Sequence, residues 1–282
     1  MKKLILLATI AFTCYSVNAQ MGINKKSARD VETLKERPLL VVLMDEDEQH
    51  GKMKNYNENI QQAINDIWTF SPSIRFITKE EWKTVYKDKD EAKKYAHLYY
   101  TEKMLQANAP NNCLLIGLAE KKVVTHFVFT PDLGLADLML SVTNLQKDLE
   151  IGNNYKKIVK EQVKLSSKFL KDSLEHKILY IDEGFVSKKL LKGIHDIYDY
   201  QYEIVSKEEI DDAIVAKDPK ILFIRHFIKA QRPTTQNGTT ESMHFALKLV
   251  YNASNLEVIS GTGAGAEIDI KDIEMFIRLI NY

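Results

Sequence analysis

Cysteine, proline and glycine are all scarce in this chain of 282 residues, which contains 2, 6 and 11 of them. Two cysteines cannot build the disulfide framework of a small secreted domain. So few prolines and glycines exclude a collagen-like chain or a proline-rich low-complexity chain. With 45% hydrophobic and 28% charged residues, the composition is that of an ordinary globular protein of one or two domains.

An excess of charge of either sign is also lacking, because 39 basic residues balance 39 acidic ones. A protein that binds nucleic acid generally has a basic face or a pI above about 9. The balance therefore argues against nucleic acid as a partner.

Long hydrophobic runs are confined to the first residues of the chain. A charged n-region precedes the apolar run Leu4–Thr13, and small residues at positions −3 and −1 predict cleavage before Gln20. We therefore expect residues 1–19 to be a signal peptide and the mature chain to lack a transmembrane segment. An uncleaved anchor and a lipoprotein acylated at Cys14 are alternatives. Export predicts a periplasmic, envelope-associated or extracellular protein.

Cys113 is the one cysteine left after removal of the leader. An intrachain disulfide and a CxxC site for zinc or redox chemistry are thereby excluded. The surrounding run, Asn112–Leu118, is typical of a buried strand, which offers neither the exposure nor the neighbouring base that a catalytic thiol needs. We expect a buried, inert thiol.

Segments of similar pattern recur in the same order in the two halves of the chain. The spacing between partners changes only between elements, where insertions are tolerated. Ordered recurrence predicts a duplicated architecture, although two α/β units with similar compositional habits would give the same pattern. The paired segments are Met44–Glu46 with Ile181–Glu183, Phe76–Trp82 with Ile204–Ile210, Leu114–Ile116 with Leu222–Ile224, and His126-Phe127 with His244-Phe245.

The periodicity predicts an α/β fold of two tandem similar units, residues 20–172 and 173–282, each a mixed β-sheet flanked by helices. Each unit reads as strand, helix, strand, helix, three strands and a closing helix. In both units a capping-box pattern marks the start of the second helix. The last elements expected in the first unit are strands at Cys113–Ala119, Val123–Thr130 and Leu135–Val142 and a helix across 155–170.

Residues 83–107 are longer than their counterpart in the second half and are predicted to be a helical insertion. Tyr95, Leu98, Tyr99 and Glu102 have the spacing of one helix face. Such a face either packs on its own domain or docks a partner.

A polar loop, Lys229–Ser242, lengthens a hairpin of the second unit and is a second candidate binding segment. The residues predicted to bind a partner are Tyr95, Tyr99, Tyr100, Arg232 and Asn237.

The acidic run Asp45–Glu48, followed by His50, comes just after a buried strand, where α/β sheets place ligands. Oxygen ligands this close could hold Mg²⁺ or Ca²⁺, although the spacing of an EF-hand is absent. Asp182-Glu183 occupies the matching position in the second half. The alternatives are a solvated loop and a metal-dependent hydrolase with its site at 45–50.

Other motifs are weaker. His126 and His244 lack an HxH or HExxH arrangement, so they predict sheet histidines rather than a zinc site. Gly261–Ala266 resembles a dinucleotide loop, but too little chain follows it for a second βα half. The GxSxG and P-loop motifs are missing. We therefore expect no metal and no cofactor.

Two segments carry a resemblance to a known group of domains. Tyr202–Ile210 and the hairpin Phe245–Ile259 resemble the α/β envelope domains of the TolB N-terminus, the CsgG family and the LpoB-type lipoproteins, over about 85 residues. Asn255 stands where that group usually has glycine. The resemblance implies an envelope-located, non-enzymatic interaction domain, and it does not imply a pore.

Together these features favour an exported, non-catalytic cell-envelope protein that binds or scaffolds another envelope protein. A metal-dependent hydrolase and a periplasmic small-molecule-binding protein with its ligand between the units are the alternatives. The sequence leaves the oligomeric state open.

Overall fold

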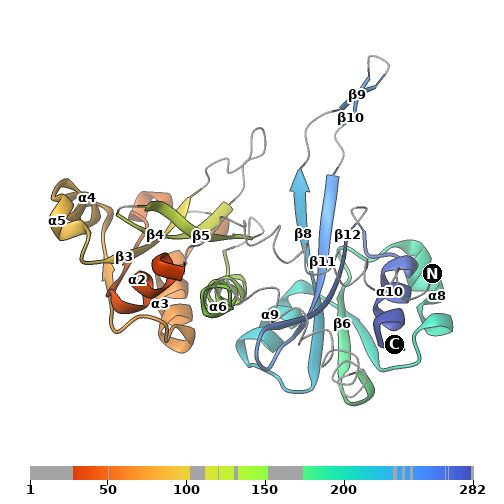
Figure 1. Ribbon diagram of the computed structural model, residues 1–282. Helices are drawn as coiled ribbons and strands as arrows, with labels where there is room; N and C mark the ends of the chain where they lie inside the picture. The colour runs from red at the N-terminus through yellow and green to blue at the C-terminus, as the bar shows by residue number, and fades with distance from the viewer. Residues whose placement is uncertain are drawn as a thin grey trace. The chain divides into compact units, whose positions relative to one another are not determined.

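The computed structural model is an α/β protein with two mixed sheets flanked by helices, as the sequence predicts (Figure 1). Its described residues fall into two compact units, an N-terminal unit up to residue 151 and a C-terminal unit from residue 174. The predicted leader and the predicted seam at 172/173 lie outside the described residues. None of the described helices is both long and apolar enough to cross a membrane. The described residues are 28–49, 51–101, 112–119, 121–129, 133–151, 174–230, 234–236, 239–241, 244–263, 265 and 267–280.

The N-terminal unit is built around a five-stranded sheet of order β2-β1-β3-β4-β5. β2 and β3 run parallel to β1, whereas β4 and β5 continue the sheet antiparallel. Its elements are α2 (Ala28–Glu36), β1 (Leu39–Val42), η1 (Glu46–Glu48), η2 (Gly51–Met53), α3 (Tyr56–Ile67), β2 (Ile74–Ile77), α4 (Lys79–Lys87), α5 (Lys89–Ala92), β3 (Ala96–Thr101), β4 (Asn112–Leu118), β5 (Lys121–Phe129) and α6 (Leu135–Ile151).

The C-terminal unit has a five-stranded sheet of order β12-β11-β8-β6-β7. A short separate hairpin, β9 with β10, connects β8 to β11. Its elements are β6 (Ile178–Asp182), α8 (Lys188–Ile197), β7 (Tyr202–Val205), α9 (Lys207–Val215), β8 (Ile221–Ala230), β9 (Thr234–Gln236), β10 (Thr239–Glu241), β11 (His244–Asn252), β12 (Glu257–Gly263) and α10 (Ile270–Ile280).

The two main sheets have the same strand order and the same strand directions. β6, β7, β8, β11 and β12 take the places of β1, β2, β3, β4 and β5. After the first strand of each unit the same backbone hydrogen bond forms, from Leu43 to Ile77 and from Glu183 to Val205, both 2.9 Å. Leu43 therefore corresponds to Glu183. The predicted match of Glu46 with Glu183 is wrong by three residues.

The helical prediction for Tyr95–Glu102 is wrong, because Ala96–Thr101 is β3 at the centre of the sheet, paired with β1 and β4. The strand divides the predicted helix face between two faces of the sheet: Leu98 lies with Ala96 on one face, where both are fully buried, and Tyr99 lies on the other. The described part of the segment 83–107, which ends at Thr101, is therefore not a helical insertion: it contains the end of α4, the short α5 and this central strand.

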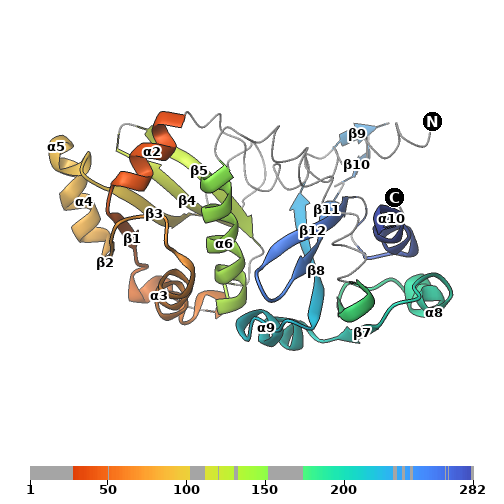
Figure 2. The ribbon, with the colours of Figure 1, turned by 60° about the horizontal axis from the view of Figure 1, so that its bottom comes forward.

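The predicted strand Leu135–Val142 is instead the start of α6. Twelve of its 17 residues are buried, and Figure 2 shows the helix running beside β5 and α3. A helix buried on all sides has the same continuous apolar run as a buried strand. These two errors shifted the later predicted matches, since β8 corresponds to β3 and not to β4. The predicted helix 155–170 lies outside the described residues.

The capping boxes predicted at the start of the second helix are confirmed in both units. The Glu81 amide donates to the Thr78 hydroxyl at 3.2 Å, and the Thr78 amide donates to the Glu81 carboxylate at 2.8 Å. In α9, Ser206 and Glu209 repeat this exchange at 3.2 and 2.9 Å. Each box satisfies two amides that have no partner within the helix.

Replacing Thr78 or Ser206 by alanine is expected to lower the free energy of unfolding by about 1 kcal/mol each. Urea denaturation followed by circular dichroism measures the loss. Thr84→Ala is the matched control, because this exposed hydroxyl lies later in α4 and bonds only to the Glu80 carbonyl in the described contacts. A cap variant as stable as this control would contradict the role of the boxes.

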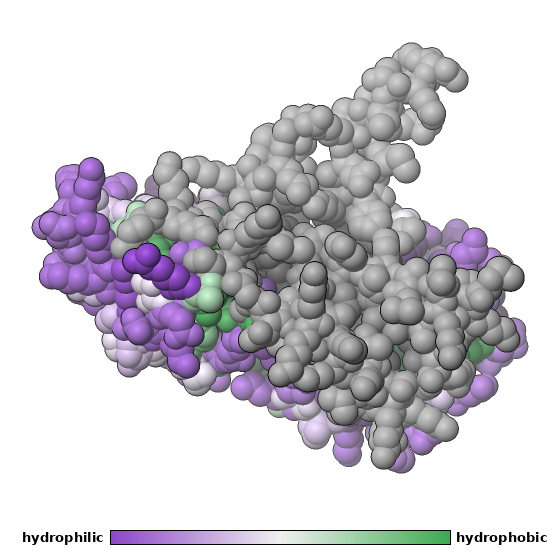
Figure 3. All heavy atoms as spheres, in the orientation of Figure 1, coloured by the Kyte–Doolittle hydropathy of each residue, from purple (hydrophilic) through white to green (hydrophobic). Residues whose placement is uncertain are grey.

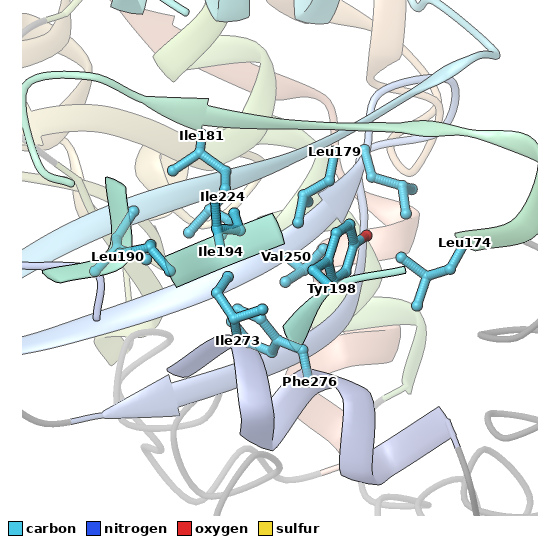
Figure 4. Close-up of a cluster of buried hydrophobic side chains, with 12 residues drawn as sticks. Leu174, Leu179, Ile181, Leu190, Ile194, Tyr198, Ile224, Val250, Ile273 and Phe276 are labelled. Atoms are coloured by element: carbon cyan, nitrogen blue, oxygen red, sulfur yellow. The ribbon is translucent and has the colours of Figure 1, made fainter. Parts of the chain in front are cut away.

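The core of the C-terminal unit lies between its sheet and the helices α8 and α10. In Figure 4 the helical side chains Leu190 and Ile194 of α8 and Ile273 and Phe276 of α10 gather with side chains of the sheet. The strands contribute Leu179, Ile181, Leu222, Ile224 and Val250. This cluster holds the closing helix against the sheet.

Candidate functional site

The three predicted binding tyrosines do not share one surface. Tyr95 and Tyr99 pack against the buried cluster Leu40, Val42 and Ile77. Tyr100 is on the opposite face of β3, as strand alternation requires. Its ring lies 5.8 Å from that of Tyr56, the first residue of α3. Arg232 and Asn237 lie outside the described residues.

Four aromatic rings form a contact network where α4 covers β3, which we name the α4–β3 aromatic group: Trp82, Tyr86, His97 and Tyr99. Trp82 has its ring centroid 5.0 Å from Tyr86 and 5.5 Å from Tyr99. His97 stacks on Tyr99 at 5.6 Å and 24°, and its ring nitrogen is hydrogen-bonded to the Tyr86 hydroxyl. The group therefore joins the helix to the sheet largely through rings, with Val85 of α4 packing beside them.

The α4–β3 aromatic group is only partly covered. His97 is buried, at 3% exposure, whereas Trp82, Tyr86 and Tyr99 are half-buried. None of the nine residues of α4, all of them described, is fully buried. The Trp82 Nε1 atom is inaccessible and has no hydrogen-bond partner among the described residues. Burial raises the pKa of the Tyr99 phenol, so this ring stays uncharged at neutral pH.

The C-terminal unit provides an internal comparison, because its capping box aligns α9 with α4. Ile210, Ala213 and Ile214 stand where α4 has Trp82, Val85 and Tyr86, and all three are buried. In the C-terminal unit, small aliphatic side chains therefore occupy the positions that are aromatic in α4.

The same contrast holds for the strand beneath the helix. By the register of the paired strands, Arg225 of β8 stands where β3 has Tyr99. Arg225 is buried and forms an ion pair with Asp211 of α9 at 3.0 Å. Helix and strand are therefore joined by an ion pair in one unit and by stacked rings in the other.

The surface around the aromatic group is charged, but its charges largely compensate one another. In Figure 3 the outer side of α4 and α5 is hydrophilic. Tyr95 donates to Glu91 at 3.1 Å, and the hydrogen bonds from Lys94 and then Tyr95 lower the pKa of that carboxyl. The ion pairs of this rim are Lys83–Glu80, Arg75–Glu81, Lys93–Asp90 and Lys94–Glu91.

The acidic run Asp45–Glu48 has a local structural role. Asp45 is the N-cap of η1, and Glu46 and Asp47 are exposed. Lys79 forms ion pairs with Glu48 and, at 3.6 Å, with Asp45, and its hydrogen bond lowers the pKa of Glu48. Within the described residues no group of three or more acidic, histidine or cysteine side chains is placed to hold a metal ion. His50 lies outside them.

Asp182, the second acidic candidate, is buried at 8% exposure. Its carboxylate accepts a hydrogen bond of 2.8 Å from the Gly184 amide and so closes the turn after β6. This contact gives the side chain a structural role as well.

A buried polar network in the C-terminal unit is not predicted by any motif. The Lys248 Nζ lies 2.6 Å from the Asp272 carboxylate, and the lysine side chain is only 1% exposed. Thr262 donates to the same carboxylate at 2.7 Å, and the Asp269 amide donates to it at 2.9 Å. The sequence feature that could have indicated this network is Lys248, which interrupts the apolar run of β11. The network attaches α10 to β11 and β12.

In the Gly261–Ala266 segment, which resembles a dinucleotide loop in sequence, Gly261 to Gly263 belong to β12. A Cβ atom at Gly261 would lie 2.4 Å from the Leu249 side chain on the neighbouring strand. Glycine at 261 therefore allows close strand packing. The side chains of His126 and His244 are not among those that the structure describes.

Cys113 is fully buried in β4, as predicted. Burial raises the pKa of its thiol from 9.0 to about 12, because the thiolate is poorly solvated there. The folded state therefore contains almost no thiolate at neutral pH, which agrees with an inert thiol.

The raised thiol pKa predicts an alkaline loss of stability. Because the folded pKa exceeds the unfolded one, the contribution is complete below pH 9 and falls as the pH rises towards 12, by about 1.4 kcal/mol per unit. In Cys113→Ala the free energy of unfolding should fall less steeply between pH 9 and 12. Urea denaturation at several pH values measures this, and parallel curves for the two proteins would contradict it.

Comparisons with known proteins identify no relative. No protein-family model matches the chain, and no match was found among curated proteins or among solved structures.

Proposed function

We propose that this chain is an exported, non-catalytic protein of the cell envelope that binds another protein through the α4–β3 aromatic group. The observation that carries the proposal is the contrast between α4 and α9. The helices begin with the same capping box, yet Trp82 and Tyr86 are half-buried where Ile210 and Ile214 are buried. Tryptophan and tyrosine supply large contact areas and are enriched at protein interfaces.

The contacts of the acidic candidates support a non-catalytic role. Asp45 is the N-cap of η1, Glu48 forms an ion pair with Lys79, and Asp182 closes a turn. Carboxylates that cap helices and form ion pairs stabilise the fold, and this accounts for their positions.

Sequence features support the location. The n-region, apolar run and cleavage pattern of residues 1–19 are those of a signal peptide. The resemblance of Tyr202–Ile210 and Phe245–Ile259 to envelope domains favours the same compartment.

Chemical crosslinking in envelope extracts of the native host, followed by affinity capture, tests the proposal. Trp82→Ala is expected to reduce capture of the partner by at least about tenfold, because aromatic residues contribute most to interface energies. Leu191→Ala is the matched control, since Leu191 is an exposed apolar side chain of the C-terminal unit, 48% accessible.

Circular dichroism must first show that both variants are folded. No captured protein, or equal capture by Trp82→Ala and the control, would overturn the proposed function.

A further inference from the structure

We infer that the outward face of α8 binds an anionic lipid surface. This basic face of α8 consists of Lys188, Lys189, Leu191 and Lys192, all exposed, with Leu191 48% accessible. Residues three and four apart are neighbours on a helix, so Leu191 lies beside the lysines. The inference goes beyond the proposed function, because the α4–β3 aromatic group belongs to the other unit.

The basic character is particular to this helix, as its counterpart α3 shows. Each of the two helices follows the first strand of its unit. In α3 the Trp68 amide donates to the Ile64 carbonyl at 2.9 Å, and in α8 the Tyr198 amide forms the same bond at 2.9 Å with Ile194. This alignment places Glu58, Asn59, Gln61 and Gln62 of α3 at the positions of Lys188, Lys189, Leu191 and Lys192.

The lysines at the start of α8 do not stabilise the helix. The first turns of α4 and α9 contain two glutamates each, whereas that of α8 contains Lys188 and Lys189 and no acid. A helix begins at the positive end of its dipole, where carboxylates are favourable and cations are not. The two lysines therefore add to the positive potential of the helix start, and their sum attracts anions such as phosphate groups.

The charges of the basic face are available to a ligand. None of its three lysines forms an ion pair with a described residue. Asp196, the only carboxylate within α8, lies one turn after Lys192 but contacts His195 at 3.2 Å. The exposed acids Glu183 and Glu267 belong to the loops before α8 and α10 and not to the helix surface.

The composition of the face favours lipid headgroups over a protein. Lysine is a flexible point charge that binds phosphate without a fixed geometry, and the headgroups of a bilayer can move to meet it. Leu191 fits the boundary between headgroups and acyl chains, where apolar side chains are buried. The apolar side of α8, with Leu190 and Ile194, stays packed in the core. The helix can therefore bind a surface reversibly while it remains folded.

Sedimentation with lipid vesicles tests the inference on the chain that starts at Gln20, because the apolar run of the leader would itself bind lipid. The vesicles contain phosphatidylglycerol and phosphatidylcholine in equal parts. We expect binding that weakens at least about tenfold when NaCl rises from about 0.05 M to about 0.5 M, because salt screens the charges. Vesicles of phosphatidylcholine alone should not bind.

The variant Lys188→Gln/Lys192→Gln should weaken binding to the anionic vesicles by at least about tenfold, because each lysine near such a surface contributes to the affinity. Leu191→Ala should weaken it by at least about threefold, through the lost apolar contact.

Lys217→Gln/Lys220→Gln is the matched control, since it removes the same charge from two exposed lysines of the same unit. They precede β8, at the end of the parallel strands β6 and β8 opposite to the start of α8. This variant should change vesicle binding by less than about twofold.

Circular dichroism must show that the variants are folded, and the salt and lipid dependence of the unsubstituted chain decides if they are not. No binding to the anionic vesicles, equal binding to phosphatidylcholine alone, or equal binding by the two double variants would overturn the inference. A glutamate peptide that binds through the same lysines while the anionic vesicles fail would also overturn it, because the face would then fit an acidic protein.

The proposed function is tested separately from this inference. Capture through Trp82 should be unaffected by Lys188→Gln/Lys192→Gln and by Leu191→Ala, because the two surfaces belong to different units. If vesicle binding fails while capture still depends on Trp82, only the lipid surface is excluded.

Discussion

Replacing Lys248 by methionine is expected to lower the free energy of unfolding by about 3–5 kcal/mol. The substitution leaves the Asp272 carboxylate buried without its cation, although Thr262 and the Asp269 amide still donate to it. Loss of one partner of a buried pair is costly because the remaining charge cannot be solvated. Urea denaturation followed by circular dichroism measures the change.

The double variant Lys248→Met/Asp272→Asn is the control. Because it also removes the remaining charge, it should be more stable than Lys248→Met alone, as seen when both members of a buried ion pair are replaced. A single variant that loses less than about 1 kcal/mol would be typical of an exposed ion pair and would contradict the buried network. Amide hydrogen exchange in α10 should be faster in Lys248→Met, because the network attaches this helix to β11 and β12.

Replacing Tyr56 by alanine is expected to cost about 3–5 kcal/mol, the usual range for removing a fully buried aromatic ring. Tyr56 begins α3, and its ring lies 5.8 Å from Tyr100. Both tryptophans lie in the N-terminal unit, so their fluorescence in a urea titration follows the unfolding of this unit.

A double-mutant cycle tests the strand geometry at the same time. Tyr56→Ala and Tyr100→Ala should show a coupling of about 0.5–1.5 kcal/mol, because their rings are in contact. Tyr56→Ala and Tyr99→Ala should be nearly additive, because Tyr99 lies on the opposite face of β3. Coupling of Tyr56 to both neighbours would contradict the alternation of a strand at this position.

The sequence predicts the order of elements better than their residues. Local chemistry is sufficient where it is strong: the capping boxes at Thr78 and Ser206 start helices, and the run Leu39–Val42 is a buried strand. Local sequence is insufficient where a helix and a strand would show the same pattern of apolar residues. β3 has helix-like spacing, and the start of α6 has the apolar run of a strand. Only the neighbouring elements, β1 and β4 for the one and α3 and β5 for the other, decide between them.

The candidate site is only partly predictable. Tyr99 was predicted from its spacing, although on the wrong type of element, whereas Trp82 was missed. The signal for Trp82 was the alignment of the two capping boxes, which places it opposite Ile210 and Tyr86 opposite Ile214. Whether those rings are half-exposed depends on how closely α4 approaches the sheet, which sequence periodicity does not specify.

Because Cys113 is buried, the rate at which its thiol is labelled reports how often the sheet of the N-terminal unit opens. A thiol reagent reacts only after β4 has separated from its neighbouring strands. In the closed state the reagent cannot reach the thiol, and the thiol is not ionised. In a variant that starts at Gln20 and so lacks Cys14, the labelling rate divided by that of an unfolded thiol gives the equilibrium constant for this opening. The free energy of a local fluctuation can then be followed in cell extract, without denaturant.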